Sequence, residues 1–439
     1  MPAVRQALTT LEEIESGLQS FLQAIGRHLT ESLIAAQPSE QSGICRECGI
    51  PLRIVDARRS LTIVGVFGSY HWERGYYVCP NGHGSDVPQD RTLALGAGHT
   101  SPLLSQILAR LAIEVPFDQV PDIVLRTMGL TVDGEMVRRG AEGIGAWAES
   151  QEQHTIEAIQ SGALPVPPAP GASTLLISLD GAMVHTARPE SGWHEGKVGV
   201  CARFEPQADT DPEANERRSP EYGPREFCIG FEPRSAFWSR LVAHARTVGL
   251  DDPSCQRIVV VGDGAHWIWD NLTVNLRCAG QSVIEILDFF HASEYVWDVA
   301  HAVWSTDSSE ATPWVTKALH RLKHEGGAVL SEVWQSLPPL TAAAQAAVIK
   351  AQGYFTYHAD RLDYPRYRAM GLPIGSGIIE SACKAVLKQR ECGSGMHWQE
   401  PHAQAIATLR AMQRSGQWDH LWAQNPCAQL VPTKRQIAA

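Results

Sequence analysis

The spacing of apolar residues changes several times along the chain. Residues 8–36 repeat apolar side chains every three to four positions, which predicts an amphipathic helix with Leu8, Leu11, Ile14, Leu18, Leu22 and Ile25 on one face. Residues 41–92 change to short strands and turns around several cysteines, and residues 100–160 turn helical again. A proline-rich linker, residues 163–173, follows this front half.

After the linker the periodicity is that of an α/β domain. Apolar runs predict three strands, most simply antiparallel neighbours, then a helix, two more strands and a helical stretch. In chain order these elements span residues 174–184, 197–205, 225–233, 237–249, 257–267, 282–291 and 292 to about 360. Two further helices are expected at 376–390 and 401–416. This order is compatible with an RNase H-like mixed sheet, in which two strand-borne aspartates and one helix-borne acid meet at one edge.

Length, composition and charge limit the class of protein. A chain of 439 residues with 44% hydrophobic and 19% charged residues indicates a globular protein of two to four domains. There is no run of eighteen apolar residues and no signal-peptide layout, so we expect a cytoplasmic protein without a membrane partner. The net charge of −11 argues against a protein that coats nucleic acid non-specifically. Residues 361–415, however, carry eight Lys/Arg against four acids, which fits one focused polyanion contact.

Three carboxylates are candidates for a divalent metal site. Asp180 and Asp263 each end an apolar run and precede a glycine, whereas Glu380 lies on a helix opened by Gly375-Ser376-Gly377. We expect Gly181 and Gly264 to let the backbone approach a substrate or metal closely. Mg²⁺ prefers hard oxygen ligands, and two such ions can support an in-line displacement at phosphorus. The alternative for each aspartate is an ordinary turn or helix-capping residue.

Four residues have the spacing of a zinc ribbon. Cys45 and Cys48 form one C-x-x-C knuckle, and Cys79 and His83 form a second, separated from the first by hairpin-like sequence. Four protein ligands would close the site, so one structural Zn²⁺ is expected. His71 and Asp86 compete with His83 for the fourth position, and a free C-x-x-C is the alternative to any metal site.

Residues 116–150 are typical of a helix, a tight turn and a second helix. Gly129 is expected to end the first helix and Asp133 to cap the second, which carries Arg138 and Arg139. These two arginines are candidate DNA contacts, although such helix pairs are also common as plain structural hairpins. The thirteen tryptophans include Trp267 and Trp269, shortly after the second aspartate, where core packing is favoured over stacking on a base.

Several stretches together resemble the ISKra-type insertion-sequence transposases, which are bacterial proteins of the DDE, RNase H-like class. These stretches are SLDGAMV, VVGDGAHWIW, LDFFH, residues 354–384 and GSGMHW. The resemblance runs from about residue 40 to 415, and its most specific part leads from GLPIGSG to the glutamate. It implies that Asp180, Asp263 and Glu380, separated by 83 and 117 residues, hold two Mg²⁺ (or Mn²⁺) ions.

A further pair of residues belongs to the same resemblance. Asp288 and His291 are similar to an Asp- or Cys-x-x-His element that related transposases carry after the second aspartate, which makes them candidate accessory residues. The alternative interpretation is that Asp288 caps the following helix and His291 lies in its first turn.

The expected activity is metal-dependent cleavage of the ends of a mobile element, followed by strand transfer into target DNA. One alternative is an RNase H-like nuclease that never joins strands, and another is a non-enzymatic, zinc-containing DNA-binding protein derived from a transposase. The expected partner is double-stranded DNA, both element ends and target, bound by a nucleoid-associated homodimer or higher oligomer. Lys384 and Lys388 follow Glu380 at helical spacing and, with Arg390, are candidate phosphate contacts.

These predictions combine into a multidomain α/β protein. The expected divisions are an N-terminal amphipathic helix at 1–40, the zinc ribbon at 41–95, a helical DNA-binding region at 96–165, an RNase H-like core at 166–291 and 366–416 interrupted by a helical insertion at 292–365, and a tail at 417–439.

Overall fold

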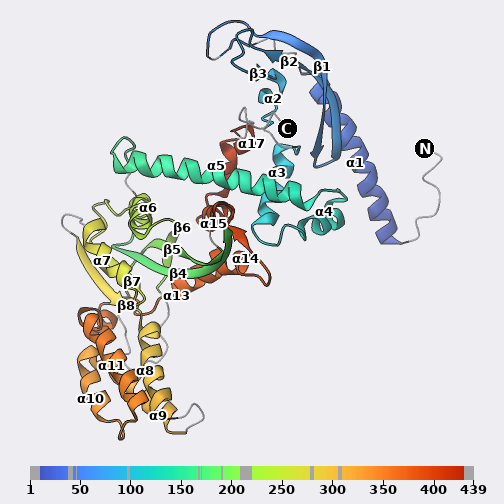
Figure 1. Ribbon diagram of the computed structural model, residues 1–439. Helices are drawn as coiled ribbons and strands as arrows, with labels where there is room; N and C mark the ends of the chain where they lie inside the picture. Colours follow the sequence, from blue (N-terminus) through green and yellow to red (C-terminus); the bar gives the residue numbers. More distant parts are fainter. Residues whose placement is uncertain are drawn as a thin grey trace. The chain divides into compact units, whose positions relative to one another are not determined.

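The protein is a mixed α/β chain of two compact units, seen here in a computed structural model (Figure 1). The structure describes residues 10–37, 43–45, 47–95, 99–166, 169, 171–188, 191–207, 220–276, 281–304 and 309–429. The first unit comprises residues 1–150 and 418–439, and the second comprises residues 151–417. The boundary near residue 150 falls within the long helix α5 (Gly134–Gln160).

The first unit consists of one long helix, a small antiparallel sheet and several helices. Its elements are α1 (Leu11–Ala35), β1 (Arg53–Gly65), β2 (Gly68–Val78), β3 (Ser85–Asp86), α2 (Pro88–Thr92), α3 (Pro102–Ala112), α4 (Val120–Met128), the first part of α5, α16 (Trp418–Ala423) and α17 (Pro426–Gln429). α1 begins with a capping box, because the Thr10 and Glu13 side chains each accept a hydrogen bond from the other residue's backbone N–H. The helix predicted for residues 8–36 is therefore confirmed over residues 11–35.

The helix, turn and helix predicted for residues 116–150 are present. α4 ends at Gly129, whose φ of 65° is a left-handed conformation that glycine adopts without steric cost. Asp133 accepts a hydrogen bond from the backbone N–H of Glu135 at 2.9 Å, which caps the start of α5 as the sequence predicted.

The second unit is built on a mixed sheet. Its strands are β4 (Thr174–Arg188), β5 (Gly192–Phe204), β6 (Tyr222–Gly230), β7 (Arg257–Gly262), β8 (Ser282–Leu287) and the short β9 (Trp398–Gln399). The strand order is β6-β5-β4-β7-β8, and β9 pairs with β4 beyond this path. β4 and β6 are antiparallel to β5, whereas β7 and β8 continue the sheet in parallel with β4. The predicted antiparallel set of three strands is confirmed.

Helices cover both faces of this sheet. They are α6 (Arg234–Thr247), α7 (His266–Asn275), α13 (Gly377–Ala382), the π-helix η3 (Cys383–Lys388), α14 (Gln389–Glu391) and α15 (Glu400–Arg414). A side chain at Gly199 of β5 would meet Leu241 of α6, and one at Gly196 would meet Leu387 of η3. Successive strand residues point to opposite faces, so α6 and η3 lie on opposite sides of β5.

A helical subdomain follows strand β8 in the chain and spans residues 289–369. It consists of α8 (Phe289–Val303), α9 (Ala311–Glu325), η1 (Gly327–Val329), α10 (Leu330–Gln335), α11 (Ala342–Tyr357), η2 (Ala359–Arg361) and α12 (Tyr364–Ala369). Apolar residues of α8, α9, α11 and α12 share one continuous core with β4, β7 and β8. The helices predicted for residues 292–365 are thus present, and this shared core holds them on the sheet.

Two predicted strands end earlier than expected, and one predicted helix is interrupted. The strand predicted for residues 257–267 stops at Gly262, because α7 begins at His266. The strand predicted for residues 282–291 stops at Leu287, since Asp288 caps α8. The single helix predicted for residues 376–390 is divided by η3, where Arg410 donates hydrogen bonds to the carbonyls of Ala385 and Val386.

A buried ion network ties α5 to α6 within the second unit. The Glu152 carboxylate lies 2.6 Å from Nε2 of His244 and 2.9 Å from the Arg240 guanidinium, and Glu226 lies 3.7 Å from Nδ1 of His244. Burial alone would lower the pKa of His244, but its hydrogen bonds with Glu152 and Glu226 outweigh burial and raise it to about 9. His244 is therefore a buried cation at neutral pH.

We expect His244→Gln to lower the free energy of unfolding by about 2 kcal/mol near pH 6. The folded pKa of about 9 lies above the ordinary value of 6.5, so the stabilisation is complete below that value and is lost as the pH rises through about 9. Urea unfolding of wild type and variant across this range measures the difference. His154→Gln, an exposed histidine of α5, is the matched control. A difference that persists undiminished at high pH would contradict this role.

Candidate metal centres

The four predicted zinc ligands come together in the first unit. The sulfurs of Cys45, Cys48 and Cys79 and a ring nitrogen of His83 all lie within 4.8 Å of one another. The Cys48–Cys79 sulfurs are 3.6 Å apart, and Nδ1 of His83 lies 3.8 Å from the Cys45 sulfur and 3.7 Å from the Cys79 sulfur. A tetrahedron with Zn–S bonds of about 2.3 Å and a Zn–N bond of about 2.0 Å has edges of roughly 3.5–3.8 Å. The donor set and its spacing therefore fit Zn²⁺.

Two tight turns present these ligands. Backbone N–H groups of Gly49 and Gly82 donate to the carbonyls of Cys45 and Cys79 at 2.9 and 3.0 Å, and both glycines adopt positive φ. Each turn thereby points its two ligands inward. Neither rival fourth ligand belongs to the cluster: His71 contacts the Thr62 hydroxyl, and Asp86 pairs with Arg91.

A second acidic site lies at one edge of the mixed sheet. In both parallel ladders the last paired residue is followed at once by an aspartate. Asp180 follows the part of β4 that pairs with β7, Asp263 follows β7, and Asp288 follows β8. Three adjacent parallel strands therefore deliver an aspartate each to the same edge, where open sheets expose their ligands.

Asp263 is held by its own turn. Its Oδ1 accepts a hydrogen bond from the backbone N–H of Ala265 at 2.9 Å, and its carbonyl accepts one from Nε1 of Trp269 at 2.9 Å. Burial raises the pKa of Asp263, and the nearby Asp180 carboxylate raises it further, while His291 opposes the shift. Trp267 and Trp269 are buried, as the core-packing interpretation predicted.

Glu380 is linked to this edge through Ser376. The Ser376 hydroxyl lies 2.5 Å from Oδ2 of Asp288 and 3.0 Å from Oε1 of Glu380, and the backbone N–H of Ser376 donates to Asp288 at 3.2 Å. A hydroxyl has one proton, so it donates to one carboxylate at a time. Burial, with a contribution from the Glu380 charge, raises the pKa of Asp288.

Asp288 and His291 match the capping interpretation. Asp288 is the N-cap of α8 and accepts a hydrogen bond from the backbone N–H of Phe290. His291 lies in the first turn of α8, half-exposed, 3.9 Å from the carboxylate of Glu294. The cap does not remove Asp288 from the acidic edge, because its second oxygen contacts Ser376.

The four acids form a negatively charged edge but not a compact ligand group. Within the part of the chain that the structure describes, no Lys or Arg pairs with Asp180, Asp263, Asp288 or Glu380. Only the Cys/His cluster, among the same residues, gathers three or more ligand atoms within 4.8 Å. The edge therefore has the oxygen donors and the uncompensated negative charge that suit a hard divalent cation. Its carboxylates lie farther apart than the ligand atoms of the Cys/His cluster.

The two glycines beside the aspartates have a different role from the one predicted. A Cβ at Gly264 would meet the Tyr354 ring at 2.1 Å, and one at Gly181 would meet the Glu195 carboxylate at 2.5 Å. The close approach is thus to side chains of the protein itself. Tyr354, from α11, is the contact that sequence reasoning missed, and its hydroxyl is buried without a hydrogen-bond partner among the described residues.

Of the predicted DNA contacts near Glu380, two are exposed and one is buried. Lys384 and Lys388 are exposed, while Ile379, Ala382 and Val386 of the same segment are buried as predicted. Arg390 is instead buried against the Trp398 ring, so the prediction that it contacts DNA is corrected.

Arg138 and Arg139 have local partners in α5. Arg138 pairs with both Glu135 and Glu142, and Arg139 pairs with Glu135. These acids offset part of the positive charge that a phosphate contact would use.

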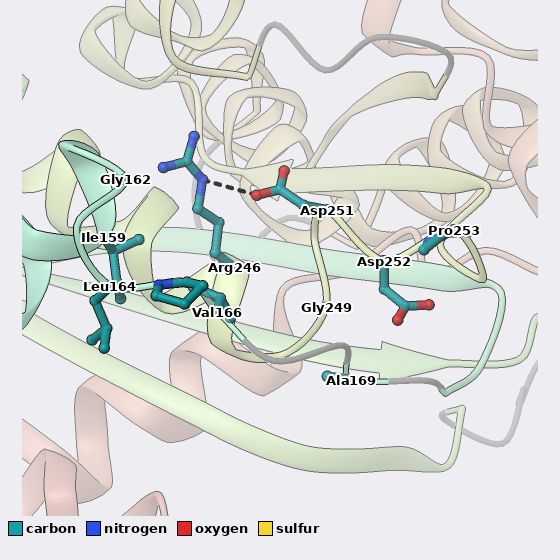
Figure 2. Close-up of a pocket in the computed structure, with 11 residues that line it drawn as sticks. Ile159, Gly162, Leu164, Val166, Ala169, Arg246, Gly249, Asp251, Asp252 and Pro253 are labelled. Atoms are coloured by element: carbon teal, nitrogen blue, oxygen red, sulfur yellow. Dashed lines mark ion pairs between the residues drawn. The ribbon is translucent and has the colours of Figure 1, made fainter.

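A cavity of about 290 Å³ lies elsewhere in the second unit, beside the linker (Figure 2). Ile159, Leu164 and Val166 line one side, and an Arg246–Asp251 ion pair of 3.1 Å lies at another. None of the predicted site residues contributes to this cavity.

No family model matches the chain, and no curated protein matches it. Among solved structures, the chain is similar to one in a "Drosophila P element transposase strand transfer complex", with 6% sequence identity and a TM-score of 0.34 over 71% of this chain and 91% of that chain. A likeness at this level establishes neither the fold nor the function of this chain. Among the described residues, no helix is long and apolar enough to cross a membrane.

Proposed function

We propose that this protein is a metal-dependent DNA transposase of the DDE class, with an RNase H-like core, encoded by an ISKra-type insertion sequence. The observation that carries the proposal is the acidic edge. Asp180 and Asp263 directly follow the last residue pair of the parallel β4–β7 ladder, and Glu380 lies on the helix that packs against β4 and β5. The catalytic assignment rests on these three acids, with Asp288 as an accessory residue.

The topology of the sheet supports the same proposal. Its five main strands follow the order β6-β5-β4-β7-β8, and only β5 runs antiparallel to the others. An acid on β4, an acid directly after β7 and a glutamate on a later helix form the arrangement expected of an RNase H-like nuclease or transposase. The quoted stretches from SLDGAMV to GSGMHW favour the ISKra type among such proteins.

The reaction consists of two in-line displacements at phosphorus. In the first, water adds to the scissile phosphorus and the 3′ oxygen of the element end leaves as a hydroxyl. In the second, that 3′ hydroxyl adds to a target phosphorus and displaces the target strand's own 3′ oxygen. Mg²⁺ held by Asp180, Asp263 and Glu380 would supply Lewis-acid chemistry at this edge. The Ser376 hydroxyl would orient Glu380 by its hydrogen bond, and the Asp288 carboxylate would hold Ser376 by accepting a hydrogen bond from its backbone N–H.

A two-stage DNA assay tests this function. A labelled duplex from the DNA that flanks the gene, incubated with Mg²⁺ and a target plasmid, should give nicked ends and then joined products. A pre-nicked duplex with a free 3′ hydroxyl should join without cleavage. Cleavage without joining of either substrate would favour the nuclease alternative. No cleavage by protein that still binds the duplex would favour the non-enzymatic DNA-binding alternative.

Lys384 and Lys388 give a separate test of the DNA path. Both are exposed in η3 one and two turns beyond Glu380, and Lys388 lies near Cys383, which is hydrogen-bonded to Asp180. We expect Lys384→Ala and Lys388→Ala each to weaken DNA binding alike for all sequences and to flatten the slope of log affinity against log salt by about one unit.

The melting temperature should barely change in either variant, because both side chains are exposed. Lys317→Ala removes an exposed lysine from α9 and is the matched control. Fluorescence anisotropy at several salt concentrations measures the slopes, and a double variant with unchanged affinity and slope would return both lysines to ordinary surface residues.

A further inference from the structure

Helix α1 exposes a continuous apolar face. Eight large apolar side chains, each 39–70% exposed, lie along its 25 residues: Leu11, Ile14, Leu18, Phe21, Leu22, Ile25, Leu29 and Leu33. At 100° per residue all of them fall within an arc of about 120°. Scattered exposed leucines are ordinary, whereas a contiguous apolar face of this length marks an interaction surface.

The rest of the first unit contacts a different side of α1. Gln19 and Gln23 donate hydrogen bonds to the carbonyls of Thr127 and Met128. Further along, a side chain at Gly26 would meet the Phe67 ring, and Ile34 is buried. Measured around the helix axis from the centre of the apolar arc, these positions lie at roughly 80–160°, whereas the arc itself ends at about 60°. The side that holds α1 to its unit therefore combines polar contacts at Gln19 and Gln23 with apolar ones at Gly26 and Ile34, and among the described residues the apolar arc stays exposed.

The open face has the size of one half of a stable interface. At roughly 100 Å² of exposed apolar surface for each side chain, eight of them present on the order of 800 Å², which is what one partner contributes to a standard protein–protein interface.

The sequence of α1 also indicates what covers this face. Read from opposite ends, its apolar positions match one another: Leu11 with Leu33, Ile14 with Leu29, and Leu18 with Ile25. To within one residue, two antiparallel copies would therefore place apolar positions opposite apolar positions along the helix.

Charge distinguishes this arrangement from a parallel one. The first turns of α1 carry Glu12, Glu13 and Glu15, whereas its second half carries one cation, Arg27, and one carboxylate, Glu31. Parallel copies would place six carboxylates at one level, whereas antiparallel copies would place each acidic end beside the half of the other helix in which Arg27 and Glu31 balance. Antiparallel helix dipoles add to the same preference.

We propose that α1 is a dimerisation helix that pairs antiparallel with α1 of a second copy of this chain. The assembly needs no DNA and no catalytic residue, so it stands independently of the proposed function.

The test is the mass of the full-length protein in solution without DNA. Light scattering after size exclusion should give twice 48.0 kDa for wild type. The double variant Leu18→Glu/Leu22→Glu should be a monomer, with a dissociation constant raised at least about 100-fold, because charges cannot be buried in an apolar interface. The control Ser20→Glu/Ala24→Glu adds the same charge to the opposite exposed side and should stay dimeric.

A circular dichroism spectrum and melting temperature should show that both double variants are folded. A monomeric wild type, in which another part of the same chain covers the face, would overturn the proposal. A dimer that survives Leu18→Glu/Leu22→Glu would overturn it as well.

Disulfide cross-linking tests the direction of pairing. A chain with Leu11→Cys mixed with a chain with Leu33→Cys should give a cross-linked heterodimer, identified by peptide mass. Leu11→Cys chains should not cross-link with one another, and their doing so would overturn the antiparallel arrangement.

Discussion

Asp263→Asn is expected to abolish Mg²⁺-dependent DNA cleavage, by at least about 1,000-fold, and at the same time to stabilise the metal-free protein. Cleavage is lost because the amide is a poor ligand for a hard divalent cation. The gain in stability, on the order of 1 kcal/mol, has another cause. Asp263 is largely buried, and the adjacent Asp180 charge repels it, so both effects raise its pKa and disappear with the charge.

Cleavage assays and chemical denaturation measure the two effects on the same preparations. Asp298→Asn, which removes an exposed carboxylate from α8, should change neither property by a comparable amount. Millimolar Mg²⁺ should raise the melting temperature of wild type and not that of Asp263→Asn. Near-normal cleavage by the variant would show that Asp263 is not a catalytic residue. An unchanged free energy of unfolding would show that the charge of Asp263 does not destabilise the metal-free protein.

Replacing Cys45 and Cys48 should remove the zinc and unfold the whole segment around the Cys/His cluster. Protein purified without chelators is expected to carry one Zn²⁺ per chain, and Cys45→Ser/Cys48→Ser should carry none. Structural zinc contributes on the order of 10 kcal/mol to the folding of such small modules, and the buried cluster here contains little besides the ligands, Leu52 and Tyr77. We expect residues 43–86 to lose protection from hydrogen exchange and to become sensitive to protease.

The control for this variant is Cys392→Ser, an exposed cysteine outside the cluster. It should keep its zinc and its exchange protection. Metal analysis by plasma mass spectrometry reports the stoichiometry directly, and wild-type protein without zinc would contradict the ribbon.

Local patterns predicted the parts of the fold that depend on local physics. The apolar repeat of α1, the cap at Asp133 and the end of α4 at Gly129 were each predicted because helix periodicity and capping are properties of neighbouring residues. The clustering of Cys45, Cys48, Cys79 and His83 was predicted for the same reason, since two short-spaced pairs fix most of a tetrahedral site.

Contacts between distant segments were beyond such patterns. Nothing near Gly264 in the sequence indicates that Tyr354, ninety positions later, packs on it. Arg390 has the composition of a phosphate contact, and only the fold shows that it is buried beside Trp398. The link from Asp288 through Ser376 to Glu380 likewise depends on the packing of α8 against the loop before α13.

The order of strands in the sheet has a consequence for how the protein folds. β4 forms antiparallel pairs with β5, its neighbour in the chain, but its parallel partner β7 follows 83 residues later at the level of the two aspartates. The β4–β5 hairpin closes a short loop and can form early, whereas the β4–β7 ladder has to close a long one. On the ribosome, this ladder cannot form before β7 has emerged, and Glu380 emerges later still. The nascent chain therefore carries an incomplete acidic edge through most of its synthesis, and the edge is complete only after the residues around Glu380 have emerged.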